Sequence, residues 1–228
     1  MIRKIIFFFF LFKLITLVFA YLATFLVPLN LQFTAATDFG LRLPYFVWIW
    51  GNFDGTHYME IARNGYHPTE HACFPLLPLF IGSLFNLLGT VTYAPYLIVG
   101  QIVSNVSFFL ALIVITKLLL VDGQRGLLRL FLLAMILFPT SFFFAAVYND
   151  SLFLLFASLT IYFARKKSWI LASVSGLLAT LTRLNGLALI FILLGEYLFS
   201  KNENLSAQWN GRKLITNVKR FSLRRFVH

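Results

Sequence analysis

The stretch Trp50-Gly51-Asn52-Phe53-Asp54-Gly55-Thr56-His57-Tyr58 is a polar segment of a chain that is otherwise strongly apolar. It sets one carboxylate and one imidazole three residues apart among aromatic rings, and hydrophobic segments flank it on both sides. A bilayer core tolerates charged side chains only at a high cost, so such a stretch is expected at a membrane surface. We therefore expect an all-α polytopic transmembrane bundle that holds this stretch in a long external first loop.

The composition supports the membrane class. The chain has 228 residues, of which 60% are hydrophobic and 12% are charged, whereas a soluble domain is about half apolar and about a quarter charged. Its 28 phenylalanines exceed what a soluble surface hides. The single cysteine, Cys73, excludes an intramolecular disulfide and a cysteine-based zinc site.

Apolar runs divide residues 1–200 into one transmembrane domain, since a spanning helix needs about 20 such residues. We predict spans near 5–27, 95–116, 127–147, 150–164, 169–182 and 186–199, with an external loop over 28–94. The first span is too long for a signal-peptide core of about 7–15 residues and is expected to be a retained signal anchor. Lys13 interrupts it and is expected to reach toward the cytoplasmic interface.

Two further features modify this plan. The run 74–88 is short for a span and contains Pro75 and Pro78, so we expect a re-entrant or interfacial helix there. The last two spans are halves of one apolar region, which breaks at the polar residues 182–186. Glycine and asparagine disfavour a continuous helix at that point.

The charge distribution predicts the sidedness. If 74–88 does not cross, the basic clusters all fall on the cytoplasmic side. The clusters are Arg3 and Lys4; Lys117, Arg125 and Arg129; Arg165, Lys166 and Lys167; and the tail 201–228. The basic residues that give the chain its net charge of +11 are then expected to be attracted to anionic membrane lipids, and we expect no nucleic-acid partner. The loop with Asp54, the segment 148–150 and the segment 183–185 fall on the opposite side.

Asp54 and His57 are the first candidates for chemistry. A helix over 54–63 would place them on one face together with Tyr58. Asp54 would then serve as a proton acceptor for a hydroxyl nucleophile. The competing interpretation, which spacing leaves open, is that Asp54 only caps a helix that starts at Gly55.

Asp150 and Arg183 are the second candidates. Asp150 would orient an acceptor or pair with Arg183, or it would cap the helix that follows. Arg183 lies in the predicted helix break, where its planar guanidinium would bind a phosphate. An ion pair of Arg183 with Asp150 or with Glu196 is the alternative, and the sequence favours neither.

The histidines of the predicted external loop do not predict a metal site. His67 and His71 are four residues apart, a spacing that can chelate a metal on a helix, but Pro68 lies between them. The order of the metalloprotease motif is absent as well. We predict no metal ligands and no cofactor, and the sequence leaves open whether a divalent cation assists.

Four stretches, the first in two parts, resemble the PIG-V-type mannosyltransferases of the GT-C superfamily, in the order of that family. They are Phe53-Asp54-Gly55-Thr56-His57-Tyr58 with Ile61-Ala62-Arg63-Asn64-Gly65-Tyr66, then Phe74-Pro75-Leu76-Leu77-Pro78-Leu79, then Phe142-Phe143-Phe144-Ala145-Ala146-Val147-Tyr148-Asn149-Asp150-Ser151, and Thr182-Arg183-Leu184-Asn185-Gly186. Together they cover residues 50–186. In the family Asp150 is commonly a glutamate and Cys73 an aromatic residue.

The resemblance implies transfer of a hexose, usually mannose, from a polyprenyl-phosphate donor to a lipid or glycan acceptor on the extracytoplasmic face. It implies that Asp54 is the general base, with His57 beside it, and that the reaction inverts the anomeric centre. Arg183 and His57 are expected to stabilise the phosphate that leaves. Asp150, Asn185 and Tyr58 are the remaining predicted substrate-binding residues.

Members of this family are commonly longer, so we expect a short or truncated member, for which a second chain would supply further spans. A non-catalytic membrane subunit is the main alternative. A transporter is less favoured, because the ionisable groups gather at helix ends and no internal repeat is evident. The expected location is the plasma membrane of a prokaryote, or the endoplasmic reticulum membrane of a eukaryote.

Overall fold

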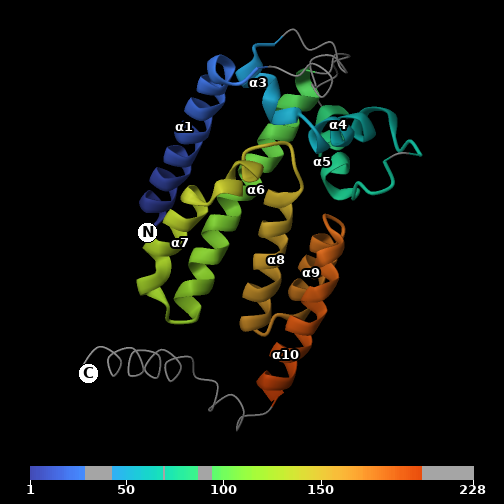
Figure 1. The fold of residues 1–228 in the computed structure, drawn as a ribbon. Helices are drawn as coiled ribbons and strands as arrows, with labels where there is room; N and C mark the ends of the chain where they lie inside the picture. The colour runs from blue at the N-terminus through green and yellow to red at the C-terminus, as the bar shows by residue number, and fades with distance from the viewer. Residues whose placement is uncertain (29–42, 69, 87–93, 202–228) are drawn as a thin grey trace, which may run out of the picture.

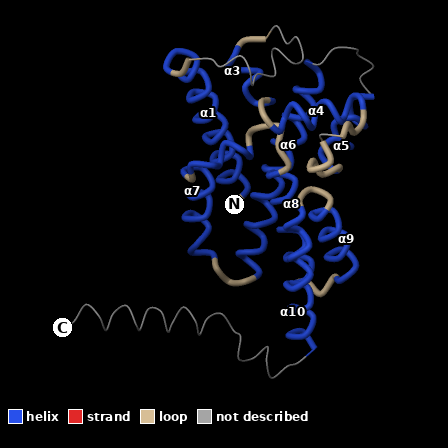
Figure 2. Tube along the Cα trace, turned by 45° about the vertical axis from the view of Figure 1, so that its right-hand side comes forward, coloured by secondary structure: helices blue, strands red, loops and turns tan. Residues whose placement is uncertain are grey.

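A computed structural model describes residues 1–28, 43–68, 70–86 and 94–201, and within these ranges all regular structure is helical (Figures 1 and 2). The elements are α1 (Ile2–Leu26), α3 (Tyr45–Trp48), η2 (Ile49–Gly51), α4 (Asp54–Asn64), α5 (Leu76–Asn86), α6 (Ala94–Val121), η3 (Arg125–Leu127), α7 (Leu128–Leu137), η4 (Pro139–Phe144), α8 (Asp150–Arg165), α9 (Trp169–Thr180), η5 (Leu184–Ala188) and α10 (Leu189–Lys201). The prediction of an all-α fold is confirmed for the described residues.

Three helical stretches are long and apolar enough to cross a membrane: Ile2–Leu26, Ala94–Val121 and Leu184–Lys201. The first two coincide with the predicted spans 5–27 and 95–116, and the third contains the span 186–199. At a rise of about 1.5 Å per residue, each is long enough for most or all of a hydrocarbon core of about 30 Å. These helices are compatible with a membrane protein.

The prediction of one continuous helix over 127–147 is wrong. The structure has a helix of 10 residues, α7, and then the separate 3₁₀ segment η4, with a break at Phe138. Pro139 causes the break, because its ring disfavours the helical conformation in the residue before it and it has no N–H to donate. Phe138 accordingly adopts an extended conformation, with φ −67° and ψ 130°.

The predicted spans 150–164 and 169–182 are helices, but each is short. Helix α8 has 16 residues and α9 has 12, against the about 20 that a span needs. Helix α9 ends at Thr180, and the next helical residue is Leu184, so the predicted polar break is confirmed. Gly186 is required there, because a Cβ atom on it would lie 2.5 Å from the Cα of Thr180.

Helix α8 occupies the centre of the bundle, between α6 and α9, and α10 packs against α8 as well (Figure 1). Helix α1 packs on α6 through aromatic rings: the ring centroid of Phe12 lies 5.0 Å from that of Phe108. The Phe108 ring also stacks on Phe144 of η4, with centroids 4.9 Å apart. The abundance of phenylalanine therefore has a packing role, since large rings fill the spaces between helices.

The two ends of the bundle differ in their ion pairs. Arg165, at the end of α8, lies 3.4 Å from Asp122 and 3.2 Å from Glu196. Asp150, at the start of α8, binds Arg183. The turns that carry the predicted basic clusters, between α6 and α7 and between α8 and α9, lie at the Arg165 end (Figure 1). This agrees with the predicted separation of charges, while the orientation in a membrane stays a prediction.

The described parts of the predicted external loop, 43–68 and 70–86, are mainly helical rather than open. They form α3, η2, α4 and α5, which gather at the end of the bundle where α6 begins (Figures 1 and 2). Helix α5 has 11 residues, about 16 Å, so it is too short to cross a bilayer alone. A re-entrant or interfacial location of α5 stays a prediction. The last residues of the run 74–88, and the tail from 202 onward, lie outside the described residues.

Candidate functional site

A tight turn places Asp54 at the first residue of α4. Phe53 has φ 54° and ψ −121°, a conformation that a type II′ turn requires and that residues other than glycine rarely adopt. The Gly55 N–H donates to the Asn52 carbonyl oxygen at 3.1 Å and closes the turn. Strain of this kind persists only where the surroundings stabilise it, and it is found preferentially at functional sites.

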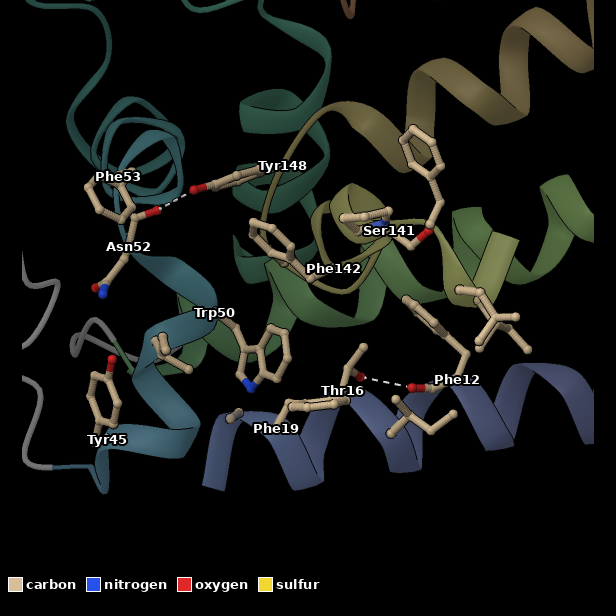
Figure 3. Close-up of a pocket in the computed structure, with 18 of the residues that line it drawn as sticks. Phe12, Thr16, Phe19, Tyr45, Trp50, Asn52, Phe53, Ser141, Phe142 and Tyr148 are labelled. Carbon is tan, nitrogen blue, oxygen red and sulfur yellow. Dashed lines mark hydrogen bonds between the residues drawn. The ribbon is translucent and has the colours of Figure 1, made fainter. Parts of the chain in front are cut away.

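The segment that precedes α8 supplies this stabilisation. The Val147 N–H donates to the Trp50 carbonyl oxygen at 2.9 Å. The Tyr148 hydroxyl donates to the carbonyl oxygen of Asn52 at 3.1 Å, across 96 positions of sequence (Figure 3). The turn before Asp54 is therefore held by backbone and side-chain hydrogen bonds from a distant part of the chain.

A further hydrogen bond ties α4 itself to the same segment. The Nδ2 of Asn149 donates to the Tyr58 hydroxyl oxygen at 2.9 Å, and both residues are buried. Tyr58, a predicted substrate-binding residue, is 7% exposed and has this structural contact; its contact with a substrate stays a prediction. Two of the resembling stretches, 53–58 and 142–151, thus form one unit in space.

Small residues allow this close approach. A Cβ on Gly55 would lie 3.4 Å from the Val147 carbonyl oxygen, and one on Gly100 of α6 would lie 2.6 Å from a Val147 methyl group. Val147 itself is fully buried. Larger side chains at these glycines would separate α4 and α6 from the segment before α8.

Asp150 and Arg183 form the second part of the site. The Nη2 of Arg183 donates to Asp150 Oδ2 at 2.6 Å, and the Arg183 side chain remains 41% exposed. Of the two ion-pair partners considered for Arg183, Asp150 is therefore the one observed. Glu196 was the wrong alternative, because it pairs with Arg165 at the other end of α8. The other guanidinium donors of Arg183 leave phosphate binding open as a proposal.

Two buried phenols, Tyr148 and Tyr58, are both affected by the charge of Asp54. Burial raises the pKa of Tyr148 to about 12, with the charges of Asp54 and Asp150 contributing to the rise. Burial also raises the pKa of Tyr58; Cys73 and Asp54 add to that rise, while Arg183 and the Asn149 hydrogen bond oppose it. Both phenols are consequently neutral hydrogen-bonding groups at physiological pH. The structure thus brings Asp54, Asp150 and Arg183 to one site.

His57 follows Asp54 on α4 and is half exposed. Its Nδ1 lies 3.6 Å from Oε1 of Glu70, whose side chain is almost fully buried. The other Glu70 oxygen accepts a hydrogen bond from the His67 N–H at 3.1 Å. Glu70 is therefore the carboxylate that lies next to Nδ1 of His57.

The residues that directly precede α4 and α8, Phe53 and Asn149, make no side-chain capping hydrogen bond. Helix α4 begins at Asp54 itself, and within the described residues no hydrogen bond joins its carboxylate to the first turn. The residue before α8, Asn149, directs its amide to Tyr58 instead, and Asp150 binds Arg183. Asn185 is exposed on η5, two residues beyond Arg183, and its predicted substrate contact stays a prediction.

Residues 1–28, 43–68, 70–86 and 94–201 contain no group of three or more histidine, cysteine, aspartate or glutamate side chains placed to hold a metal ion. His67 has Glu60 at 4.0 Å, and His71 lines a separate small cavity beside Cys73. The spacing of these two histidines therefore does not produce a cluster.

A cavity of about 650 Å³ adjoins the turn before Asp54 (Figure 3). Its walls are mainly apolar and come from α1, the α3–η2 segment and the α7–η4 segment, with Phe12, Phe19 and Phe142 among them. Asn52, Phe53 and Tyr148 line it where it meets the turn. The break at Pro139 that interrupts the predicted span helps to shape this cavity, because Phe138 and Pro139 line it too.

Asn52, Tyr148 and Asn149 were not identified as a set from the sequence, and no role was assigned to Glu70. Their contacts join positions 91 and 96 residues apart, for which local spacing carries no signal. The positive φ of Phe53 could not be predicted from the sequence either, because glycine, the usual residue in that conformation, is absent at this position.

In the part of the chain that the structure describes, all regular structure is helical, three helical stretches are long and apolar enough to cross a membrane, and Asp150 pairs with Arg183 at one end of the bundle. No protein-family model, no curated protein and no solved structure matches this chain.

Proposed function

We propose that this chain is a membrane glycosyltransferase, which moves a hexose from a polyprenyl-phosphate donor to a hydroxyl group of a lipid or glycan acceptor. One observation carries the proposal: the exposed Asp54 carboxylate directly follows Phe53, which lines the apolar cavity of about 650 Å³. A reactive carboxylate beside an apolar cavity suits a substrate that is polar at one end and hydrocarbon at the other. The resemblance of residues 50–186 to PIG-V-type mannosyltransferases favours mannose as the hexose.

In the proposed reaction Asp54 removes the proton from the acceptor hydroxyl. The oxygen attacks the anomeric carbon, the bond from that carbon to the donor phosphate breaks, and the configuration inverts. The proton ends on Asp54 and the electron pair on the phosphate. The strained turn at Phe53 and its hydrogen bond from Tyr148 hold the base in place, and such preorganisation lowers the activation barrier.

The leaving phosphate needs a cation or hydrogen-bond donors. Arg183 has one nitrogen on Asp150 and keeps further donors on a side chain that is 41% exposed. An arginine fork stabilises phosphate charge strongly when it is preorganised, and Asp150 orients it. His57 is the second donor in this proposal, through the nitrogen that Glu70 does not face.

The experiment is transfer of labelled mannose from polyprenyl-phosphate mannose by membranes that contain this chain. Asp54→Asn should lower the rate by about 10²-fold or more, because it removes the base without changing the size of the side chain. Asp122→Asn is the matched control, since Asp122 pairs with Arg165 at the opposite end of α8, and it should retain the wild-type rate. Full activity of a folded Asp54→Asn protein would contradict the assignment.

The alternative of a non-catalytic membrane subunit predicts no transfer by the wild-type chain under any donor. Asp54→Asn and wild type would then be indistinguishable. A folded wild-type chain that transfers no sugar, with several polyprenyl-phosphate hexoses as donors, would favour that alternative.

A further inference from the structure

Lys13 is the charged residue in the middle of α1, and its surroundings are unusual for a transmembrane helix. It lies 11 residues beyond the start of α1, which at about 1.5 Å per residue is roughly 16 Å along the helix. Its ammonium group lies 5.5 Å from the centre of the Trp50 ring. Within residues 1–28, 43–68, 70–86 and 94–201, the structure gives this ammonium no carboxylate partner.

Lys13 lines a groove of about 760 Å³ between α1 and α6, and Trp50 lines both this groove and the cavity near Asp54. Gln101 and Asn105, one turn apart on α6, line the same groove. Asn105 Nδ2 donates to Gln101 Oε1 at 3.1 Å, but Gln101 Nε2 and Asn105 Oδ1 are buried and have no hydrogen-bond partner in the described part of the chain. Two buried polar atoms beside the groove therefore have no hydrogen-bond partner among the described residues.

The apolar residues of the groove repeat with helical spacing. The exposed ones on the two helices are Ile6, Phe10 and Leu17 on α1, and Ile98, Ile102 and Val106 on α6. Exposure of such residues is ordinary beside lipid. An ammonium without a carboxylate partner, beside amide groups that are only partly satisfied, is not ordinary, because polar groups within transmembrane helices usually pair with one another across a helix interface.

We propose that this groove binds a transmembrane helix of another chain, and that a carboxylate near the middle of that helix pairs with Lys13. The charge of Lys13 selects an acidic partner, and the spacing of the apolar residues suits a helix laid along the groove. Lipid phosphate does not reach this depth, because it lies at the surface of a hydrocarbon core about 30 Å thick.

A second copy of this chain is a poor partner. It would bring another Lys13, and the acids on the described apolar helices, Asp150 and Glu196, already pair with arginines. The proposal does not depend on the glycosyltransferase assignment, because neither Lys13 nor the α6 amides line the cavity near Asp54.

The test uses the purified full chain in phosphatidylcholine vesicles, with a donor fluorophore at its amino terminus. The probe is an acceptor-labelled leucine-rich transmembrane peptide that carries one central aspartate; matched peptides carry asparagine or leucine there. Energy transfer should saturate with the aspartate peptide. Lys13→Met should weaken that binding by about tenfold, while Lys4→Met, at the end of α1, should not.

Equal binding of the leucine peptide, no effect of Lys13→Met, or no saturable signal from the aspartate peptide would each overturn the proposal. Displacement of the aspartate peptide by phosphatidylglycerol would also overturn it, since the groove would then take an anionic lipid. Lys13→Met removes a charge from an apolar helix and should not impair folding, which thermal unfolding of the variant verifies.

Discussion

The two ends of α8 carry ion pairs of the same chemical kind in different surroundings. At one end Arg165 contacts Asp122 and Glu196 beside the basic residues Lys166 and Lys167. At the other end Arg183 contacts Asp150, and the charge of Asp54 acts on Asp150 as well. Both arginines are partly exposed, so neither pair by itself contributes much stability. The comparison teaches that the neighbours of an ion pair, rather than its residues, distinguish a candidate site.

The largest difference between the two ends should appear in the transfer rate when each arginine is replaced by lysine. Arg183→Lys keeps the charge but removes the planar fork, and should lower sugar transfer by about 10²-fold. Arg165→Lys should change the rate by less than about threefold, because a surface pair contributes little. Rates with polyprenyl-phosphate mannose measure both. Equal losses in the two variants would remove the distinction between the ends.

A smaller difference should appear in stability when a glycine at each end is replaced by alanine. A Cβ on Gly186, in the break that carries Arg183, would lie 2.5 Å from backbone atoms of Thr180. We expect Gly186→Ala to cost about 3 kcal/mol through forced overpacking. Gly126, in the turn before α7, has open space around it, and Gly126→Ala should cost less than about 0.5 kcal/mol. The midpoints of thermal unfolding in detergent compare the two; similar midpoints would contradict the close approach of Gly186 to Thr180.

The smallest expected effect concerns Cys73. It is the single cysteine, so a thiol reagent specifically reports on the end of the bundle that carries Asp54. Burial raises the pKa of the Cys73 thiol, and the nearby charges of Asp54 and Glu70 raise it further. Because the thiolate is the reactive form, maleimide labelling of Cys73 should be slower than that of free cysteine at neutral pH. Asp54→Asn removes one of the two negative charges, so it should lower the pKa and speed labelling by about two- to threefold.

The control for this measurement is Asp122→Asn, which removes a carboxylate at the far end of α8. It should leave the pH dependence of Cys73 labelling unchanged. An identical labelling rate in wild type and Asp54→Asn would show that the Asp54 charge does not reach Cys73.

Much of the architecture was predictable from local pattern. The apolar runs at 5–27 and 95–116 located α1 and α6, and the polar residues at 182–186 located the break between α9 and α10. The prediction of one helix over 127–147 was wrong, because the segment is hydrophobic throughout but Pro139 divides it. Proline acts through backbone geometry, and a count of apolar residues does not register that effect.

The candidate site was also only partly predictable from the sequence. Asp54, His57, Asp150 and Arg183 could be chosen from the sequence, because charged side chains at the ends of apolar runs are few. Their activity as a glycosyltransferase site stays a proposal. The partners of these residues could not be chosen, because Tyr148, Asn149 and Glu70 matter through contacts with Asn52, Tyr58 and His57 that only the folded chain creates.

The sequence by itself determined the positions of the long apolar helices and the identity of the charged groups, since these follow from hydrophobicity and charge along the chain. Only the tertiary structure decided that Arg183 pairs with Asp150 rather than Glu196, and that Phe53 adopts a strained turn beside an apolar cavity. The physical reason is that the hydrophobicity and the charge of a segment depend only on the residues of that segment. Ion pairs, hydrogen bonds and cavities depend on distances between segments, which the packing of the helices sets.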